Sequence, residues 1–260
     1  MRPSSLARKA VKAAALPLGV PSLRRHGDLV ILLYHRVGRG SREIDLPVRT
    51  FDAHLAMLSG SRRARSLDDA LAGREGGIVV TFDDGYRDFP EHVVPLLVRY
   101  GVPALLYLAT GLVANGRTSS SEALTWSQLA EAISTGLVAV GSHTHSHADL
   151  SRATEQEAED EMRRSKELIE DRLGVACRHF AYPFAVSAQP ADRAARRLFD
   201  TAALDAWRTN RAGRIDPHRL GRTPVLRGDG RLLFRAKARG MLDAEALVYR
   251  ALGRGPWSRS

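Results

Sequence analysis

The residues with the clearest capacity for chemistry end an apolar segment. Residues 78–86 read Ile-Val-Val-Thr-Phe-Asp-Asp-Gly-Tyr, so a strand-length apolar run stops at two adjacent carboxylates and a glycine. Two carboxylates in a poorly solvated site resist joint ionisation, and a bound cation would relieve that conflict. The alternative is that Asp83, Asp84 and Gly85 form only a turn after a strand. The segment therefore predicts either a metal and acid–base centre or a simple strand exit.

A run of three histidines supplies the second chemical pattern. Residues 141–147 read Gly-Ser-His-Thr-His-Ser-His and follow another short apolar run. If the segment turns helically, His143 and His147 point the same way because they are four residues apart, whereas His145 points elsewhere. Two imidazoles and one carboxylate leave an open position for water, as in hydrolytic zinc sites. The spacing favours His143 and His147 as metal ligands over ordinary surface or core histidines, with His145 as a packing or hydrogen-bonding neighbour.

The segments that must position these residues alternate between strand and helix patterns. Apolar runs with the length of strands occur at residues 29–34, 78–82, 104–108, 137–140, 175–182, 200–204 and, weakened by Gly221 and Pro224, 220–226. Helical patterns cover residues 50–58, 66–71, 90–100, 125–133, 151–173, 191–198 and 232–252, with Thr50, Ser66 and Thr125 as N-caps. Such alternation predicts a parallel sheet, either open or closed as a barrel. His35, Asp83 and the histidines all follow strand-like runs, so we expect them to share the face where α/β barrels place their sites.

Composition sets further bounds on the function. The chain has 260 residues, of which 44% are hydrophobic, so it can bury a substantial core as one domain. Its formal charge of +10 comes mainly from arginine, but no helix-turn-helix, zinc-finger or base-stacking pattern accompanies it, and nucleic acid is not a predicted partner. A single cysteine, Cys177, excludes an internal disulfide and a thiolate metal cluster. Any metal must therefore be held by histidine and carboxylate.

The N-terminal residues 1–27 form a basic leader. Lys9 and Lys12 precede a short apolar stretch that Pro17 and Pro21 interrupt before it reaches the length of a signal peptide. No segment of the sequence is long enough for a transmembrane helix. The sequence thus predicts a cytoplasmic protein, and the leader is a candidate for weak peripheral contact with the inner face of the membrane, the alternative being a soluble tail.

Residues 81–85 and 143–147 together resemble the first two signature motifs of the polysaccharide deacetylases that carry a NodB-type homology domain. The pairing, order and spacing of the two motifs are specific, and the likeness runs from about Val30 to Val225. Residues 33–37, Leu-Tyr-His-Arg-Val, also resemble the opening strand of a bacterial subgroup whose members often modify exopolysaccharides.

The resemblance also implies the architecture. It implies an α/β protein with a single domain folded as a distorted (β/α)7-type barrel. The catalytic, NodB-like domain would occupy residues 28–228, after the basic leader at 1–27. A basic, helical C-terminal extension would follow at residues 229–260.

Roles for individual residues follow from the resemblance. Asp84, His143 and His147 would bind one divalent metal ion, usually zinc, and Asp83 would be the general base. In the subgroup with the early Tyr-His pair, that strand is thought to supply the catalytic histidine, which implies His35 as the general acid.

A third segment, Phe-Ala-Tyr-Pro-Phe-Ala at residues 180–185, resembles the third motif of the family. The resemblance implies that Tyr182, Pro183 and Phe184 form a wall of the substrate groove and that this motif offers a backbone N–H to an oxyanion. The C-terminal motif of the family, with its leucine and catalytic histidine, is not evident after Leu226.

Two positions depart from that third motif. Many members carry an arginine that holds the base aspartate where Ala181 stands, and many carry glycine where Ala185 stands. A base aspartate beside another carboxylate still needs a cation to stay ionised. Arg222 is the predicted partner of Asp83, because a late strand there would point a guanidinium into the barrel mouth. Arg219 is the second candidate, and the alternative is that both are surface arginines.

The predicted function combines these residues. An amide resists hydrolysis because water is a weak nucleophile and an amine is a poor leaving group. A metal-activated water with an aspartate base supplies a stronger nucleophile, and an imidazolium acid protonates the leaving amine. We therefore predict a metal-dependent hydrolase that removes N-acetyl groups from the amino sugars of a polysaccharide or its precursor, a glycan bearing N-acetylhexosamine. The alternatives are another metal-dependent C–N hydrolase acting on a small amide, and a catalytically silent glycan-binding partner in polysaccharide assembly, which the Ala181 and Ala185 departures favour.

Overall fold

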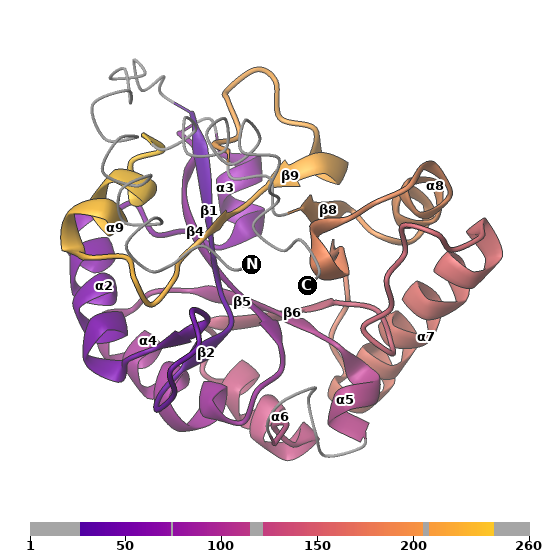
Figure 1. The fold of residues 1–260 in the computed structure, drawn as a ribbon, viewed down its shortest axis with the longest axis horizontal. Helices are drawn as coiled ribbons and strands as arrows, with labels where there is room; N and C mark the ends of the chain where they lie inside the picture. The colour runs from indigo at the N-terminus through magenta and orange to yellow at the C-terminus, as the bar shows by residue number, and fades with distance from the viewer. Residues whose placement is uncertain (1–26, 74, 115–121, 205–207, 242–260) are drawn as a thin grey trace.

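The computed structural model describes residues 27–73, 75–114, 122–204 and 208–241 (Figure 1). In these residues a ring of helices surrounds a set of parallel strands. The leader predicted at residues 1–27 and the second half of the extension predicted at 229–260 lie almost wholly outside the described residues.

The strands form one eight-stranded sheet in which every pairing is parallel. Its order is β10-β1-β4-β5-β6-β7-β8-β9. The bounds are β1 Leu29–Tyr34, β4 Gly77–Asp84, β5 Ala104–Leu108, β6 Val138–Ser142, β7 His179–Ala181, β8 Thr201–Leu204, β9 Leu220–Gly221 and β10 Thr223–Pro224. A small second sheet pairs β2 (Arg36–Val37) with β3 (Asp45–Leu46) just after β1.

The last segment closes the large sheet into a barrel. β9 pairs with β8, β10 pairs with β1, and Arg222 lies between the two pieces with its amide bonded to Leu204 O at 2.8 Å. β9 and β10 therefore act as one short strand that bridges β8 and β1, which gives the distorted (β/α)7-type barrel expected from the sequence. The continuous strand predicted at 220–226 is wrong in detail, because the segment changes its partner strand at Arg222 and Pro224 has no N–H to donate.

Side chains of the strands alternate between the barrel interior and the surrounding helices. Helix α3 (Leu67–Ala72) closes one end of the interior. The interior cluster consists of Leu29, Ile31, Leu67, Ala70, Val79, Leu105, Tyr107, Ala181, Ala203 and Leu220. The outer faces of the strands pack against the helices in a larger cluster that includes Val30, Leu32, Val80, Phe82, Leu106, Val140, Phe51, Leu55, Met162 and Ile169. Because side chains fill the interior, chemistry must take place at an end of the barrel.

Helices form the outer layer. Besides α3 they are α2 Val48–Ser61, the π-helix η1 Phe89–Val93, α4 Val94–Tyr100, α5 Thr110–Ala114, α6 Trp126–Ser134, α7 Glu155–Leu173, α8 Gln189–Leu198 and α9 Arg231–Ala238, with 3-10 turns η2 Pro183–Ala185 and η3 Pro217–Arg219. In Figure 1 the larger helices run round the strands from α9 and α2 on the left, past α6, to α7 and α8 on the right. No described helix is both long enough and apolar enough to cross a membrane.

Three helix starts test the predicted N-caps. The Ser66 side chain accepts from the third helical amide of α3, and Thr125 forms a capping box at the start of α6, so both predictions are confirmed. The prediction for Thr50 is wrong, since α2 begins three residues earlier than a cap at Thr50 would place it. Its N-cap is Pro47, whose φ of −61° suits entry into a helix without a side-chain cap.

Two further boundaries differ from expectation around α7. The helix begins after Thr154 rather than near Ser151, because Thr154 and Glu157 form a capping box. The strand predicted at 175–182 shortens to β7, because the chain before it bonds to the end of α7. There Cys177 N donates to Glu170 Oε1 at 3.0 Å, which removes that amide from any sheet.

The described start of the predicted C-terminal extension is helical and packs on the barrel. Phe234 of α9 is fully buried and stacks on His54 of α2, with ring centroids 3.5 Å apart and 6° between the planes. Lys237 is also buried, and its ammonium donates to Asp229 and to the carbonyl of Pro224, each at 2.7 Å. The Phe234 stack attaches α9 to α2, and the Lys237 hydrogen bond attaches it to Pro224 in the strand segment that closes the barrel.

Candidate metal and acid–base site

Parallel strands bring the sequence-predicted site residues to one end of the barrel. Across the sheet, Asp84 pairs with Leu108 and Leu108 with Ser142, so β4, β5 and β6 end level, and β1 ends two residues earlier, where Tyr34 pairs with Phe82. The residues that follow these ends, or form them, are His35, Asp83, Asp84 and His143. The expectation of a shared face is therefore confirmed for these strand ends.

The backbone turns sharply where the two aspartates leave β4. The side chain of Asp83 follows the alternation of β4 and points into the barrel, as that of Val79 does. Asp84, in contrast, has a left-handed φ of 76°. Five non-glycine residues of the described chain have positive φ, and four of them, Asp84, Thr144, His147 and Phe184, belong to the predicted site segments. Such conformations are costly for side chains that carry a Cβ, and their concentration here makes this end of the barrel the candidate site.

The histidine loop does not form the expected helical turn. The left-handed φ values of Thr144 and His147 interrupt any helix. The predicted reason for the alignment of the two rings, helical i,i+4 spacing, is therefore wrong. The loop is instead curled by Glu161 of α7, whose carboxylate accepts from the amide of His145 at 3.0 Å. The rings of His143 and His147 still meet, with centroids 4.9 Å apart.

Asp84, His143 and His147 converge on one point. One ligand atom from each lies within 4.8 Å of the others, and this is the one such grouping of histidine, cysteine or acidic residues found in the described part of the chain. Asp84 Oδ1 is 3.7 Å from His143 Nε2 and 3.3 Å from His147 Nε2. One carboxylate and two imidazoles are a donor set that suits zinc and similar divalent ions.

Hydrogen bonding prepares His143 as a ligand. Its Nδ1 lies 2.8 Å from Ala181 O, and because a carbonyl can only accept, Nδ1 carries the proton and Nε2 presents its lone pair towards the aspartates. The imidazole is 2% exposed, and burial lowers its pKa to about 4 despite the charge of Asp83. A neutral imidazole with a fixed tautomer is what metal ligation requires.

Charge balance around Asp84 also fits a cation. Burial acts to raise the pKa of Asp84, but the hydrogen bond and charge of His147 lower it well below its usual range. Burial acts to lower the pKa of His147, but the hydrogen bond to Asp84 and the charges of both aspartates together outweigh it and raise the pKa. The Asp84 carboxylate is thus ionised and stabilises a positive charge beside it. A bound metal ion would supply such a charge.

Asp83 is held by the arginine that the sequence predicted. Arg222 Nη1 and Nη2 donate to the two carboxylate oxygens of Asp83 at 2.7 and 2.8 Å, and the exposed fractions of the two residues are 0% and 3%. Burial acts to raise the pKa of Asp83, but the charges of Arg222, His143 and His35 and the Arg222 hydrogen bond together outweigh it, and the pKa falls. Arg219 is not the partner, because it donates to Asp192 at 2.7 Å on the surface.

His35 directly follows β1 and is partly buried. Because Tyr34 pairs with Phe82, His35 follows β1 at the level where Asp83 follows Phe82 on the neighbouring strand, and its charge lowers the pKa of both Asp83 and Asp84. The next residue is clamped, since Arg36 Nε donates to Asp88 at 2.9 Å and its guanidinium lies 5.0 Å over the Tyr86 ring. This clamp ties the segment that carries His35 to the segment that follows the aspartates, and sequence reasoning missed it.

The third motif reaches the site mainly through Phe184. Its ring is 43% exposed and meets His147 edge-on, with centroids 4.6 Å apart. Pro183 starts the 3-10 turn η2. Tyr182 faces away, because its hydroxyl donates to Asp192 of α8 at 2.9 Å and its amide donates to Ala203 O at 3.0 Å. The Tyr182 amide therefore bonds to the sheet in this structure, and the backbone N–H that the motif would offer to an oxyanion stays a prediction.

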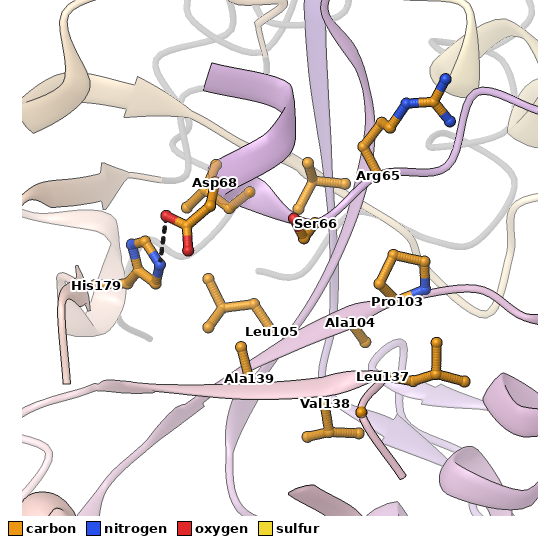
Figure 2. A pocket seen from close by; sticks show the side chains of 13 residues that line it. Arg65, Ser66, Asp68, Pro103, Ala104, Leu105, Leu137, Val138, Ala139 and His179 are labelled. Atoms are coloured by element: carbon orange, nitrogen blue, oxygen red, sulfur yellow. Dashed lines mark ion pairs between the residues drawn. The ribbon is translucent and has the colours of Figure 1, made fainter. Parts of the chain in front are cut away.

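A separate cavity of about 110 Å³ lies at the opposite end of the barrel, where the strands begin (Figure 2). Its lining includes Pro103 and Leu137, which precede β5 and β6, together with Asp68 of α3 and the buried His179. His179 Nε2 lies 3.4 Å from Asp68 Oδ1, and a dashed line marks this pair in Figure 2. This end holds the α3 closure and none of the residues predicted for chemistry.

Comparison with known proteins places the chain in a family. The family model described as polysaccharide deacetylase matches residues 71–200, which is half of the chain and includes both aspartates and both histidines. The chain belongs to the polysaccharide deacetylase family.

Individual relatives agree with this assignment. The Bacillus subtilis protein named "putative polysaccharide deacetylase YxkH" is 27% identical over 163 residues, which span 60% of this chain and only 56% of that relative. Among solved structures, IcaB from Ammonifex degensii is 27% identical with a TM-score of 0.70, covering 83% of this chain and 97% of that one. The deacetylase PplD from Streptococcus pyogenes, solved with acetate, shares the fold at 24% identity and a TM-score of 0.70, covering 77% of this chain and 93% of that one.

Proposed function

We propose that this protein is a metal-dependent hydrolase that removes N-acetyl groups from the amino sugars of a polysaccharide or of its precursor. The observation that carries the proposal is the convergence of Asp84, His143 and His147 beside a second aspartate, Asp83, which is buried against Arg222. Membership of the polysaccharide deacetylase family supports hydrolysis of a C–N bond. The N-acetylated glycan is the substrate class that both lines of argument favour.

The three converging residues would hold the metal, for which we propose zinc. When bound, such an ion supplies Lewis acidity, polarising the substrate carbonyl and making water at its open position more acidic. The protein contributes the neutral Nε2 of His143, the Nε2 of His147 and the carboxylate of Asp84. Ala181 O fixes the His143 ring through Nδ1, as outer hydrogen bonds do in other metal sites.

Asp83 has the position and charge of a general base. Both of its oxygens accept from Arg222, and the remaining lone pairs are available to take a proton from water. The arginine serves two purposes, because it fixes the plane of the carboxylate and keeps it ionised although it is only 3% exposed. Asp83 is therefore the residue to which we assign removal of the proton from the attacking water.

His35 is assigned the opposite proton transfer. It lies beside both aspartates at the barrel mouth, and its imidazolium would donate a proton to the amide nitrogen as the C–N bond breaks. Water oxygen becomes part of acetate, its proton goes to Asp83, and the sugar leaves with a free amine. Phe184 would flank the site as an exposed aromatic wall.

The arginine also bears on the silent glycan-binding alternative. That alternative drew its support from two departures, Ala185 and Ala181, of which Ala181 cannot hold the base. Arg222 provides the missing cation from another strand, so the departure at Ala181 no longer favours loss of catalysis. We place the enzyme in the cytoplasm, with the basic leader against the inner face of the membrane near a nascent or lipid-linked glycan, a proposal supported by the basic residues of that leader.

Acetate release from N-acetylglucosamine oligomers and a panel of other N-acetylated glycans, with added zinc, cobalt or nickel, tests the proposal. Asp83→Asn should abolish release and leave metal content unchanged, because it removes the base and no ligand. His145→Gln is a matched control, since His145 bonds to Thr110 at 2.9 Å and lies outside the ligand group. No acetate from any glycan, with the protein folded and metal bound, would contradict glycan deacetylation and favour one of the two alternatives, the small-amide hydrolase or the silent glycan-binding partner.

A further inference from the structure

A row of three residues crosses the barrel just below the site. Asp83 on β4 pairs with Tyr107 on β5, and Tyr107 pairs with Gly141 on β6. Tyr107 is fully buried and belongs to the interior cluster. Its ring leans over Gly141, because a Cβ added there would come within 2.9 Å of Tyr107 Cδ1. The glycine therefore leaves room for an aromatic ring in the same layer as the base.

Arg222 enters this layer from the strand segment that closes the barrel. Its guanidinium carbon lies 5.2 Å from the centre of the Tyr107 ring, within the range of a cation–π contact. The same guanidinium holds Asp83 through its two terminal nitrogens. Asp83 thus fixes the edge of the guanidinium, and Tyr107 flanks it.

The hydroxyl of Tyr107 adds nothing to this arrangement. In the described chain it is one of the few buried side-chain oxygens with no hydrogen-bond partner, and burial raises the pKa of Tyr107 far above its usual range. A buried hydroxyl that bonds nothing costs stability. The ring, rather than the hydroxyl, is the part of the side chain that makes the contact.

We propose that Tyr107 is a positioning residue for the deacetylase reaction, acting through Arg222 on Asp83. The inference rests on the proposed function. Without the ring, the guanidinium loses the surface beside it and can tilt within the barrel, and the carboxylate it holds tilts with it. Misplacement of a base lowers the rate of proton removal. Tyr107 does not reach the substrate, so substrate binding should be unaffected.

Steady-state kinetics on a set of variants separates this role from simple packing. Tyr107→Leu should lower kcat by about 10-fold with KM within about twofold, because it removes the ring from an oriented base. Tyr107→Phe keeps the ring and should restore kcat to near the wild-type value. In an Arg222→Ala background, Tyr107→Leu should cause little further loss, since its effect is transmitted through the arginine.

Leu105→Ala is the matched control. Leu105 lies two residues away on the same strand and in the same interior cluster, but towards the opposite end of the barrel, where it lines the cavity of Figure 2. It should lower the urea concentration at the midpoint of unfolding, as truncation of a core leucine does elsewhere, without a selective fall in kcat. An unchanged kcat in Tyr107→Leu, or an equal loss with and without Arg222, would overturn the proposal.

A readout without turnover keeps this inference separate from the proposed function. The NMR resonances of the Arg222 guanidinium should carry a ring-current shift from Tyr107, and an Arg222→Lys variant assigns them. The shift should persist in Tyr107→Phe and disappear in Tyr107→Leu. If wild-type protein released no acetate, the proposed function would fail on its own assay, whereas guanidinium resonances unchanged in Tyr107→Leu would refute the positioning contact itself.

Discussion

His54 should make the fold sensitive to acid. The side chain is 3% exposed, its ring stacks on Phe234 of α9, and its Nδ1 lies 3.3 Å from the hydroxyl of Tyr34. Burial lowers the pKa of His54 from 6.5 to about 4, while the nearby carboxylate of Asp229 acts to raise it and the ammonium of Lys237 acts to lower it. The imidazole is therefore neutral in the folded protein at neutral pH.

The sign and size of the effect follow from linkage. Because the folded pKa lies below the unfolded one, protonation favours the unfolded chain, and stability present above pH 6.5 is lost as pH falls towards 4. The full difference corresponds to about 3.4 kcal/mol once both states are protonated. At about pH 5 the unfolded imidazole is mostly protonated and the folded one mostly neutral, and the loss relative to about pH 7.5 is about 2 kcal/mol.

Urea unfolding of wild type and of His54→Phe at about pH 7.5 and about pH 5 measures this contribution. Phenylalanine can still stack on Phe234 but cannot take a proton, and its loss of the Tyr34 hydrogen bond is the same at both pH values. The wild type should lose about 2 kcal/mol more than the variant between the two pH values. Equal losses in the two proteins would refute the reasoning.

Three further predictions concern the site and the leader. His143→Ala and His147→Ala should each empty the metal site, because each removes one of three ligands, and full metal content by elemental analysis in either variant would refute the assignment. Arg222→Ala should lower kcat by roughly 100-fold, about 2.7 kcal/mol of barrier, with metal content unchanged. Near wild-type turnover there would mean that another group orients Asp83. Deleting residues 1–27 should reduce co-sedimentation with anionic vesicles, as should added salt, since each basic residue near anionic lipid contributes about 1 kcal/mol. Equal pelleting of the deleted protein would remove the membrane proposal.

Much of the site was predictable because strand ends carry local signals. The apolar run before Asp83 and Asp84 and the run before the histidines identify strands that end at the same edge of a parallel sheet. The pairing of Asp83 with Arg222 followed from chemistry, since a buried base beside a second carboxylate requires a cation. Both arguments need only residue types and the direction of strands.

The rest depends on packing that local sequence does not encode. Which side chain meets Arg222 across the barrel depends on the stagger of the strands, which the sequence does not show. From the sequence, Tyr107 is therefore only one residue of the apolar run 104–108. The clamp between Arg36 and Asp88 joins residues 52 apart in sequence, and a loop bond from Glu161 shapes the histidine segment in place of the expected helical turn. The switch of strand partner at Arg222 likewise appears only when β8 and β1 are both in place.

The way the barrel closes couples folding to activity. The proposed metal ligands lie within residues 84–147, at the end of β4 and after β6, and only β5 separates these two strands in the sheet. The cation for the base, in contrast, lies 139 residues beyond it and arrives with the final strand segment. Contacts between such distant parts of a chain form late in folding, because the loop between them must first be ordered. A molecule whose barrel has not closed would thus hold its metal ligands together but leave its base unaligned, so hydrolysis would begin only when the last strand has docked.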